Sequence, residues 1–199
     1  MGSLNAPFGL RVTGRLDNGS LEVFRQYPIA SGYAANIAAG DVVMLTDNGT
    51  STTITKQTAT GDTSADIAML GVFMGCSYTD PSTGQLTFSN MWPTGTVASD
   101  ALAFVCDDPQ ALYVVQADEA ITNSLDIYGK NAAIVQGAVN TTFKASRVAL
   151  DASTIGTDAN LPLRIIDYVG GPRGGEAGTS FPLLVVKLNY TQLTAAVGV

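Results

Sequence analysis

The sequence predicts a mainly β protein, a β-barrel or a jelly-roll-like β-sandwich with an extended N-terminal arm and little helix. Two observations support this prediction. Short runs rich in Val, Ile, Thr and Phe recur at a spacing of about ten residues, which is typical of the strands of a barrel or sandwich. Clusters of Asp, Asn, Gly and Pro, which form tight turns, stand between these runs. We find no repeat of fixed period and no heptads.

The first part of the chain predicts an arm, a strand and a hairpin. Residues 1–20 are rich in Gly and Asn and predict the arm, and residues 22–29 predict a strand. Residues 42–46 and 52–55 flank the Asp-Asn-Gly turn 47–49, which is a strong hairpin signal.

A second hairpin is predicted to follow. The apolar run 67–79 is interrupted by Gly71 and Gly75, and its aromatic residues favour a bent or bulged buried strand over a helix. The turn 80–84 carries Pro at its second position and ends in Gly, so residues 85–89 should return beside the first strand.

The later part of the chain is less regular. Between residues 118 and 136 a helix-like spacing predicts at most a single short helix. The tail, residues 190–199, is small and apolar, so it is either frayed or laid on a neighbour. Further strands are predicted over 102–106, 112–116, 148–150, 163–169 and 183–189, with a short one around residue 143.

These elements divide the chain into three parts. An extended arm occupies residues 1–20, a main β domain residues 21–117, and a smaller β-rich C-terminal lobe with its tail residues 118–199. A chain of 199 residues is long enough for one large domain or two small ones.

The composition argues against several classes of function. The chain has no His, so it cannot build a Ser-His-Asp or Cys-His catalytic arrangement. Its net charge of −7 disfavours direct binding of nucleic acid. With 46% hydrophobic residues, we expect a homo-oligomer or a component of an assembly. We predict that the protein is not an enzyme and has no catalytic residue, no cofactor and no metal site.

The two cysteines and the N-terminal sequence indicate the compartment in which the protein is made. Cys76 and Cys106 each lie in an apolar run, the usual setting of a buried thiol, and a disulfide between them stays open as the less favoured reading. There is no signal-peptide pattern at the start and no apolar stretch of membrane-spanning length. We therefore expect a soluble protein that is made in the cytoplasm and does not bind a membrane.

Three local patterns resemble chemical sites but fit them poorly. The glycine-rich segment 170–175 lacks the Gly-Lys-Ser/Thr ending of a phosphate-binding loop, so we interpret it as a loop between strands. The scattered aspartates match no calcium-binding loop. Ser146 lies near Lys144 but outside the Ser-x-x-Lys spacing, which makes a hydrolase the weakest hypothesis.

Binding residues are predicted among the aromatic and basic side chains. Most aromatic residues should lie in the core, but Trp92 stands between turns and is predicted to lie in an interface. Phe8, Arg11 and Arg15 on the arm are predicted partner contacts, because a basic arm on an acidic body suits an acidic partner. Tyr190 near the C-terminus is a further predicted partner contact.

Several segments together resemble a known family. They are the opening Asn5-Ala6-Pro7-Phe8-Gly9-Leu10-Arg11, the run Ile29-Ala30-Ser31-Gly32-Tyr33, Gly40-Asp41-Val42-Val43, Leu70-Gly71-Val72-Phe73 with Gly75-Cys76, Asp80-Pro81-Ser82-Thr83-Gly84, Trp92-Pro93, Asp107-Asp108-Pro109 and the stretch 161–169. In style and order these segments look like the capsid decoration (cement) proteins of tailed bacteriophages. The resemblance covers nearly the whole chain and includes no catalytic signature.

The resemblance implies a virion protein on the outer surface of the head, synthesised in the host cytoplasm. Its partner would be the major capsid protein, which it would bridge to its neighbours and stabilise against internal DNA pressure. Closed symmetry favours cyclic oligomers, and we expect a trimer at threefold positions, with a dimer second. The alternative reading is a carbohydrate-binding head-fibre or adsorption module, which the aromatic residues and the Thr- and Asn-rich turns also suggest.

Overall fold

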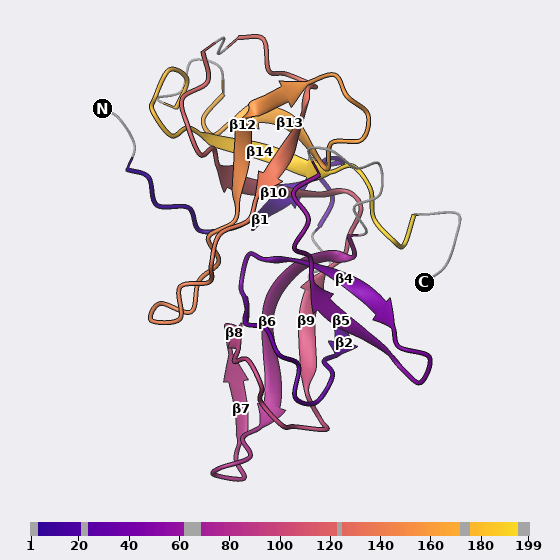
Figure 1. The fold of residues 1–199 in the computed structure, drawn as a ribbon. Coiled ribbons are helices and arrows are strands. Elements are labelled where there is room, and N and C mark those ends of the chain that lie inside the picture. Colours follow the sequence, from indigo (N-terminus) through magenta and orange to yellow (C-terminus); the bar gives the residue numbers. More distant parts are fainter. Residues whose placement is uncertain (1–3, 21–23, 62–68, 123–124, 172–175, 195–199) are drawn as a thin grey trace.

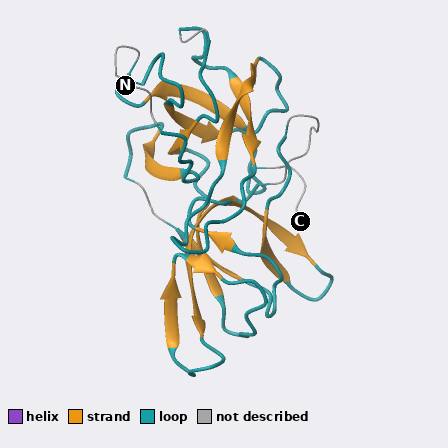
Figure 2. Cartoon of the chain, turned by 60° about the vertical axis from the view of Figure 1, so that its left-hand side comes forward, coloured by secondary structure: helices purple, strands orange, loops and turns teal. Residues whose placement is uncertain are grey.

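The computed structural model describes residues 4–20, 24–61, 69–122, 125–171 and 176–194. Within these residues the protein has fourteen β-strands. Figure 2 shows strands and loops and no helix. The predicted mainly β fold with little helix is therefore confirmed. The short helix predicted between residues 118 and 136 is absent from the described part of that stretch, where strand β11 (Asn131–Val135) and turns are found instead.

Six antiparallel strands form the upper sheet of Figure 1. In β14 (Leu183–Leu188) buried and half-buried side chains alternate, and the buried Leu184, Val186 and Leu188 face the core. In spatial order the strands are β1 (Arg11–Arg15), β10 (Ala111–Gln116), β14 (Leu183–Leu188), β13 (Leu163–Tyr168), β11 and β12 (Ala149–Gly156).

The lower sheet contains both predicted hairpins. The first pairs β4 with β5, and the second pairs β6 with β7 across the turn that begins at Asp80. The register of β6 shifts between Phe73 and Gly75, which confirms the predicted bulge. In order the strands are β2 (Arg25–Pro28), β9 (Leu102–Cys106), β6 (Gly71–Thr79), β4 (Val42–Asp47) and β5 (Thr52–Lys56), with β7 (Leu86–Ser89) beside β6; β3 (Ile37–Ala38) and β8 (Met91–Trp92) form a separate pair.

Neither sheet is a closed barrel. In the lower sheet a single bridge between Ile29 and Ile54 brings the two edges together, and in the upper sheet a single bridge joins Ala117, just after β10, to Leu150 of the edge strand β12. No continuous ladder joins those edges in the described strands, so each sheet is curled but open. The two curled sheets give a sandwich-like architecture, and the barrel reading is wrong.

The chain is divided between the sheets differently from the division predicted at residues 20 and 117. Strand β1, placed in the arm by the sequence, is hydrogen-bonded to β10 at the edge of the upper sheet. Strand β10 was expected in the main domain but pairs with β14. The whole lower sheet is therefore inserted between two neighbouring strands of the upper sheet. Only the segment from Leu4 to Leu10 is a strandless extended arm.

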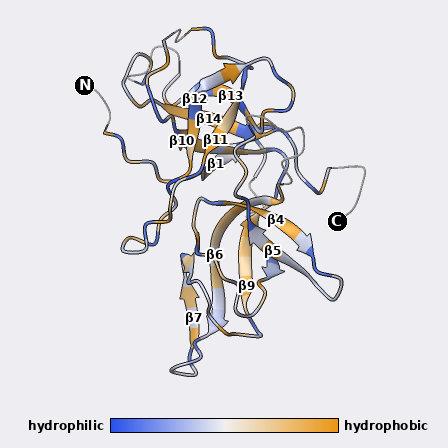
Figure 3. Cartoon of the chain, in the orientation of Figure 1, coloured by the Kyte–Doolittle hydropathy of each residue, from blue (hydrophilic) through white to orange (hydrophobic). Residues whose placement is uncertain are grey.

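Each sheet surrounds its own core, and the two cores meet. Figure 3 shows that hydrophobic residues concentrate in the strands of both sheets. In the lower core Phe73 and Trp92 are fully buried, and in the upper core Tyr113 is. Val42, Val72 and Cys106 belong to lower-sheet strands but pack in the upper core, so the lobes share apolar contacts; with them pack Leu10 and Met69.

A buried carboxylate fixes the junction of the lobes. Asp41 is 0% exposed, and its Oδ2 accepts hydrogen bonds from Lys56 Nζ at 2.9 Å and from the Ala38 N–H at 2.9 Å. Its Oδ1 accepts a bond from Ser146 Oγ at 2.6 Å, and Ser146 Oγ accepts one from the Val148 N–H. Burying a charge is costly unless it is paired and hydrogen-bonded, and here every partner is present.

The backbone around Asp41 joins four segments of the chain. Leu10 N–H donates to Gly40 O, Ser146 N–H to Ala39 O, and Ala39 N–H to Asn90 O. Gly9 lies so close to this loop that a Cβ there would stand 2.6 Å from Gly40 O and from Ser146 Cβ, and its φ is +79°. Only glycine fits at that position.

The cysteines are free and buried. Cys106 on β9 lies opposite Val72 and Cys76 on β6 lies opposite Ala103, so four residues of β6 separate the two pairs. At about 3.4 Å per residue the separation is roughly 13 Å, beyond the reach of a disulfide. The open question of a disulfide is therefore answered: the two thiols are not bonded.

Replacing Asp41 by Asn is expected to lower the free energy of unfolding by about 3 kcal/mol, because it leaves the Lys56 ammonium without its buried counter-charge. Urea unfolding measures the effect. Asp47→Asn, in an exposed turn, is the control and should cost under about 1 kcal/mol. Equal losses in the two variants would contradict the structural role of Asp41.

The native protein is expected to resist thiol reagents. Burial raises the pKa of Cys76 to about 12 and also raises the pKa of Cys106 above its ordinary value, so little reactive thiolate forms at neutral pH. A chromogenic disulfide reagent should detect no thiol in the folded protein and two per chain after unfolding in urea. Fast reaction of the folded protein would contradict the burial, and no reaction after unfolding would indicate a disulfide.

Candidate functional site

Trp92 does not lie in an interface, contrary to the prediction. Its side chain is 0% exposed and packs edge to face against Tyr78, with ring centroids 5.4 Å apart. Its indole N–H donates to Tyr33 O at 3.4 Å. Strand β8 turns the indole inward because its partner strand β3 covers the lower core. Trp92 therefore stabilises the core and is not available to a partner.

The basic residues of the N-terminal part do not form one patch. Arg15 bonds Asp17 and lies 3.1 Å from an oxygen of Asp108, so its charge is balanced within the chain. Arg25 is paired with Asp107 at 2.9 Å. Arg15, predicted as a partner contact, therefore has its guanidinium engaged by two carboxylates of the chain itself.

Phe8 and Arg11, both predicted as partner contacts, lie together on the N-terminal segment. The Arg11 guanidinium stands 4.6 Å from the centre of the Phe8 ring, a cation–π arrangement. Arg11 is exposed and forms no ion pair with any described residue, whereas Phe8 is half-buried. Both side chains are accessible to a partner.

Tyr190 is 43% exposed and follows the end of β14. Its hydroxyl donates to Ala159 O. The next residues of the tail lie on the lower sheet, where Gln192 exchanges two hydrogen bonds with the backbone of Leu45. The described part of the tail is thus laid on the neighbouring sheet, and Tyr190 remains open on one side.

The largest cluster of exposed aromatic side chains lies on the outer face of the lower sheet. We call Phe24, Leu86, Phe88 and Phe104 the aromatic face. The rings of Phe88 and Phe104 are stacked with centroids 6.4 Å apart and planes at 8°, and Phe24 meets Phe104 edge-on at 5.4 Å. Phe88 is 71% exposed. Exposed apolar clusters of this kind mark sites that bind another molecule.

The strand register explains why these side chains share one face. Phe88 lies opposite Ser77 and Leu86 lies opposite Thr79, while Phe104 lies opposite Gly75, whose missing side chain leaves room for the ring. Ser77 is buried, and the Thr79 hydroxyl donates to the carboxylate of Asp100, so one charged group adjoins this face beside Leu86. Strand β7, which carries Leu86 and Phe88, pairs only with β6 among the described strands and leaves its other edge unpaired.

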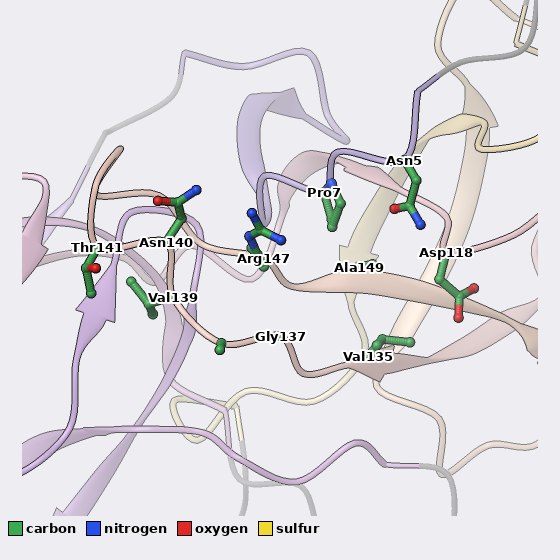
Figure 4. A pocket seen from close by; sticks show the side chains of 11 residues that line it. Asn5, Pro7, Asp118, Val135, Gly137, Val139, Asn140, Thr141, Arg147 and Ala149 are labelled. Carbon is green, nitrogen blue, oxygen red and sulfur yellow. The ribbon is translucent and has the colours of Figure 1, made fainter.

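Two hollows lie on either side of the loop 137–147. One, of about 580 Å³, is lined by Asn5, Pro7, Asp118 and Arg147, whose side chains Figure 4 shows. The other, of about 450 Å³, is lined by Phe8, Arg11, Phe143 and Lys144 among others.

The structure bears on two chemical sites that the sequence analysis considered, a Ser-Lys pair and a metal site. Ser146, considered for a Ser-Lys pair, is fully buried and donates to Asp41, and no hydrogen bond joins it to Lys144. Among the described residues no group of three or more Cys, Asp or Glu side chains is placed to hold a metal ion. The glycine-rich segment 170–175 lies mostly outside the described residues.

No family model, no curated protein and no solved structure matches the chain. None of the described residues forms a helix of the length and hydrophobicity needed to span a membrane.

Sequence reasoning missed Phe24, Leu86, Phe88 and Phe104 as a binding surface. The hairpin 71–89 does carry a signal for this surface. Its turn at residues 80–85 places Leu86 opposite Thr79, so these two side chains lie on the same face of the sheet. The sequence does not say which face of β6 is covered, because both faces of that strand are largely buried.

Tyr27 is expected to make stability fall at high pH. Burial raises the pKa of Tyr27 from 10.0 to about 12, and its hydrogen bond to Asp107 acts in the same direction. The folded state therefore holds this proton more tightly than the unfolded state, and the stability so gained is complete below pH 10.0 and lost as the pH rises towards about 12.

Tyr27→Phe should consequently lose less unfolding free energy across this pH window than the unchanged protein. Urea unfolding below and within the window measures the difference, in which the contributions of the other tyrosines and of the cysteines cancel. Identical losses would contradict the assignment.

Proposed function

We propose that this protein is a decoration (cement) protein of a tailed-bacteriophage head. It attaches to the outer surface of the major capsid protein shell and stabilises the shell against the pressure of packaged DNA. The sequence resemblance supports this proposal over nearly the whole chain. The structural observation that supports it is the aromatic face, where the rings of Phe88 and Phe104 are stacked and Phe88 is largely exposed.

Such a function depends on contact area and needs no chemical step. Aromatic side chains supply large, rigid surfaces and are frequent among the residues that dominate protein interfaces. Many copies around a closed shell act together, so a modest affinity per copy adds up across the head. Opposite Phe88 the sheet presents the buried, uncharged Ser77, so covering this part of the face buries no charge.

A homo-oligomer, a trimer before a dimer, remains part of this proposal. The unpaired edge of β7 supports it, because exposed edges favour pairing with another chain. In the proposed assembly the protein is not an enzyme, uses no cofactor and makes no direct contact with nucleic acid or a membrane.

A carbohydrate-binding head-fibre or adsorption module is the second candidate. One observation favours it: the flat stack of Phe88 on Phe104 shares its face with Thr79, whose hydroxyl is bonded to the carboxylate of Asp100. A sugar ring placed on the phenyl rings would find these groups as hydrogen-bond partners. The two candidates make different predictions for the same surface.

Phe88→Ser is expected to weaken attachment to capsids that lack the protein by about tenfold or more, because it removes a side chain at the centre of the contact. Co-sedimentation with such capsids at varied protein concentration measures the affinity. A matched pair of variants tests whether the effect is specific to the aromatic face. Leu86→Ser removes an exposed leucine from the aromatic face, and Leu125→Ser removes an exposed leucine from the other lobe.

The proposal predicts that Leu86→Ser reduces attachment and Leu125→Ser does not. If the Phe88→Ser variant binds the capsid as tightly as the unchanged protein does, the aromatic face is not the attachment surface. Absence of binding to the capsid, together with binding to a glycan array that Phe88→Ser abolishes, would favour the adsorption module.

A further inference from the structure

A groove of about 450 Å³ lies where the projecting loop, residues 137–147, meets the N-terminal segment. In Figure 1 this loop extends sideways at the level where the two lobes meet. Phe143, near the tip, is 79% exposed. The groove lies between Phe143 and Lys144 on the loop and Phe8 and Arg11 on the N-terminal segment, with Met74 of β6 also lining it.

The charge of this groove is opposite to that of the protein. The chain carries a net charge of −7, yet Arg11 and Lys144 line the groove and no described Asp or Glu does. Neither cation forms an ion pair with a described residue, and Arg147 at the other side of the same loop forms none either. By contrast, Arg15 and Lys56 are paired elsewhere.

The floor of the groove is held rigidly. Gly40 is part of the loop that Asp41 anchors, and Ala145 immediately precedes Ser146, which is bonded to the same carboxylate. Asn140 and Ala145 exchange backbone hydrogen bonds and close the projecting loop. A site that is ordered before binding loses little freedom when a ligand enters, which favours affinity.

We propose that this groove binds an acidic, extended segment of a partner protein, with carboxylates at Arg11 and Lys144 and an apolar side chain between Phe8 and Phe143. A peptide fits better than a nucleic acid, because two cations on an acidic body provide too little positive charge to hold a phosphate backbone. The aromatic and Met74 side chains supply the apolar contact that a simple anion site lacks.

The inference does not depend on the proposed attachment to a capsid, and its test uses the purified full chain alone. The probes are short fluorescein-labelled peptides in which Asp alternates with Leu or Phe, and fluorescence anisotropy measures their binding. Control peptides carry Asn in place of every Asp, or Ser in place of every apolar residue. A single-stranded DNA oligonucleotide is the polyanion control.

We expect saturable binding of the Asp-Leu and Asp-Phe peptides that weakens as salt is raised. The double variant Arg11→Gln, Lys144→Gln should weaken it at least about fivefold, and Phe143→Ser should also weaken it. All three side chains lie at the surface, and melting curves verify that the variants fold. Lys187→Gln, which removes an unpaired cation of β14, should leave the affinity unchanged.

Four outcomes of the binding measurements would overturn the proposal. They are no saturable binding of any acidic peptide, equal binding of the Asn peptides, equal loss in Lys187→Gln and in the double variant, and oligonucleotide binding that depends on Arg11 and Lys144 more strongly than peptide binding does. Self-association of the chain that only the double variant abolishes would assign the groove to a second copy instead and would also overturn it.

Discussion

The buried carboxylate of Asp41 is the interaction on which the rest of the structure depends. It accepts hydrogen bonds from Lys56 on β5, from the backbone at Ala38 and from Ser146 at the base of the projecting loop. These partners come from widely separated parts of the chain. Because an unpaired buried charge is far costlier than a paired one, the partners are held in one arrangement. That arrangement fixes the inserted lower sheet against the sheet that surrounds it in sequence.

Both candidate binding surfaces follow from this arrangement. The groove has its floor in the anchored loop, where Gly9 and Gly40 approach too closely for any side chain on Gly9. The aromatic face lies on the far strands of the same lower sheet, whose β6 is bonded to that loop through Phe73. The two lobes also share an apolar core through Val42 and Val72. We therefore interpret the protein as one rigid body that carries two separate contact surfaces.

Local patterns predicted most of the longer strands well and their partners poorly. The short strand predicted around Phe143 is wrong, because that residue lies in a turn of the loop 137–147. The hairpin 42–56 and the bulge near Gly75 follow from turn residues and glycines that act on their immediate neighbours. The pairing of β1 with β10 joins residues about a hundred positions apart, and nothing local in either segment specifies it. Trp92 was misplaced for a related reason: its flanking turns suggested exposure, but the strand pair β3 and β8 covers the core there. Asp41 could not be identified from the sequence, because its partners converge only in the fold.

Imaging capsids that lack the protein after mixing them with it, by cryo-electron microscopy, tests the central claim most directly. The account predicts ordered, saturable density at fixed symmetry positions, with the aromatic face of the lower sheet against the shell. Because the molecule is rigid, the whole structure should fit that density without rearrangement of its lobes. Ordered density with Phe88 directed to solvent would contradict the assigned surface, and absence of density at saturating protein would contradict the decoration function itself.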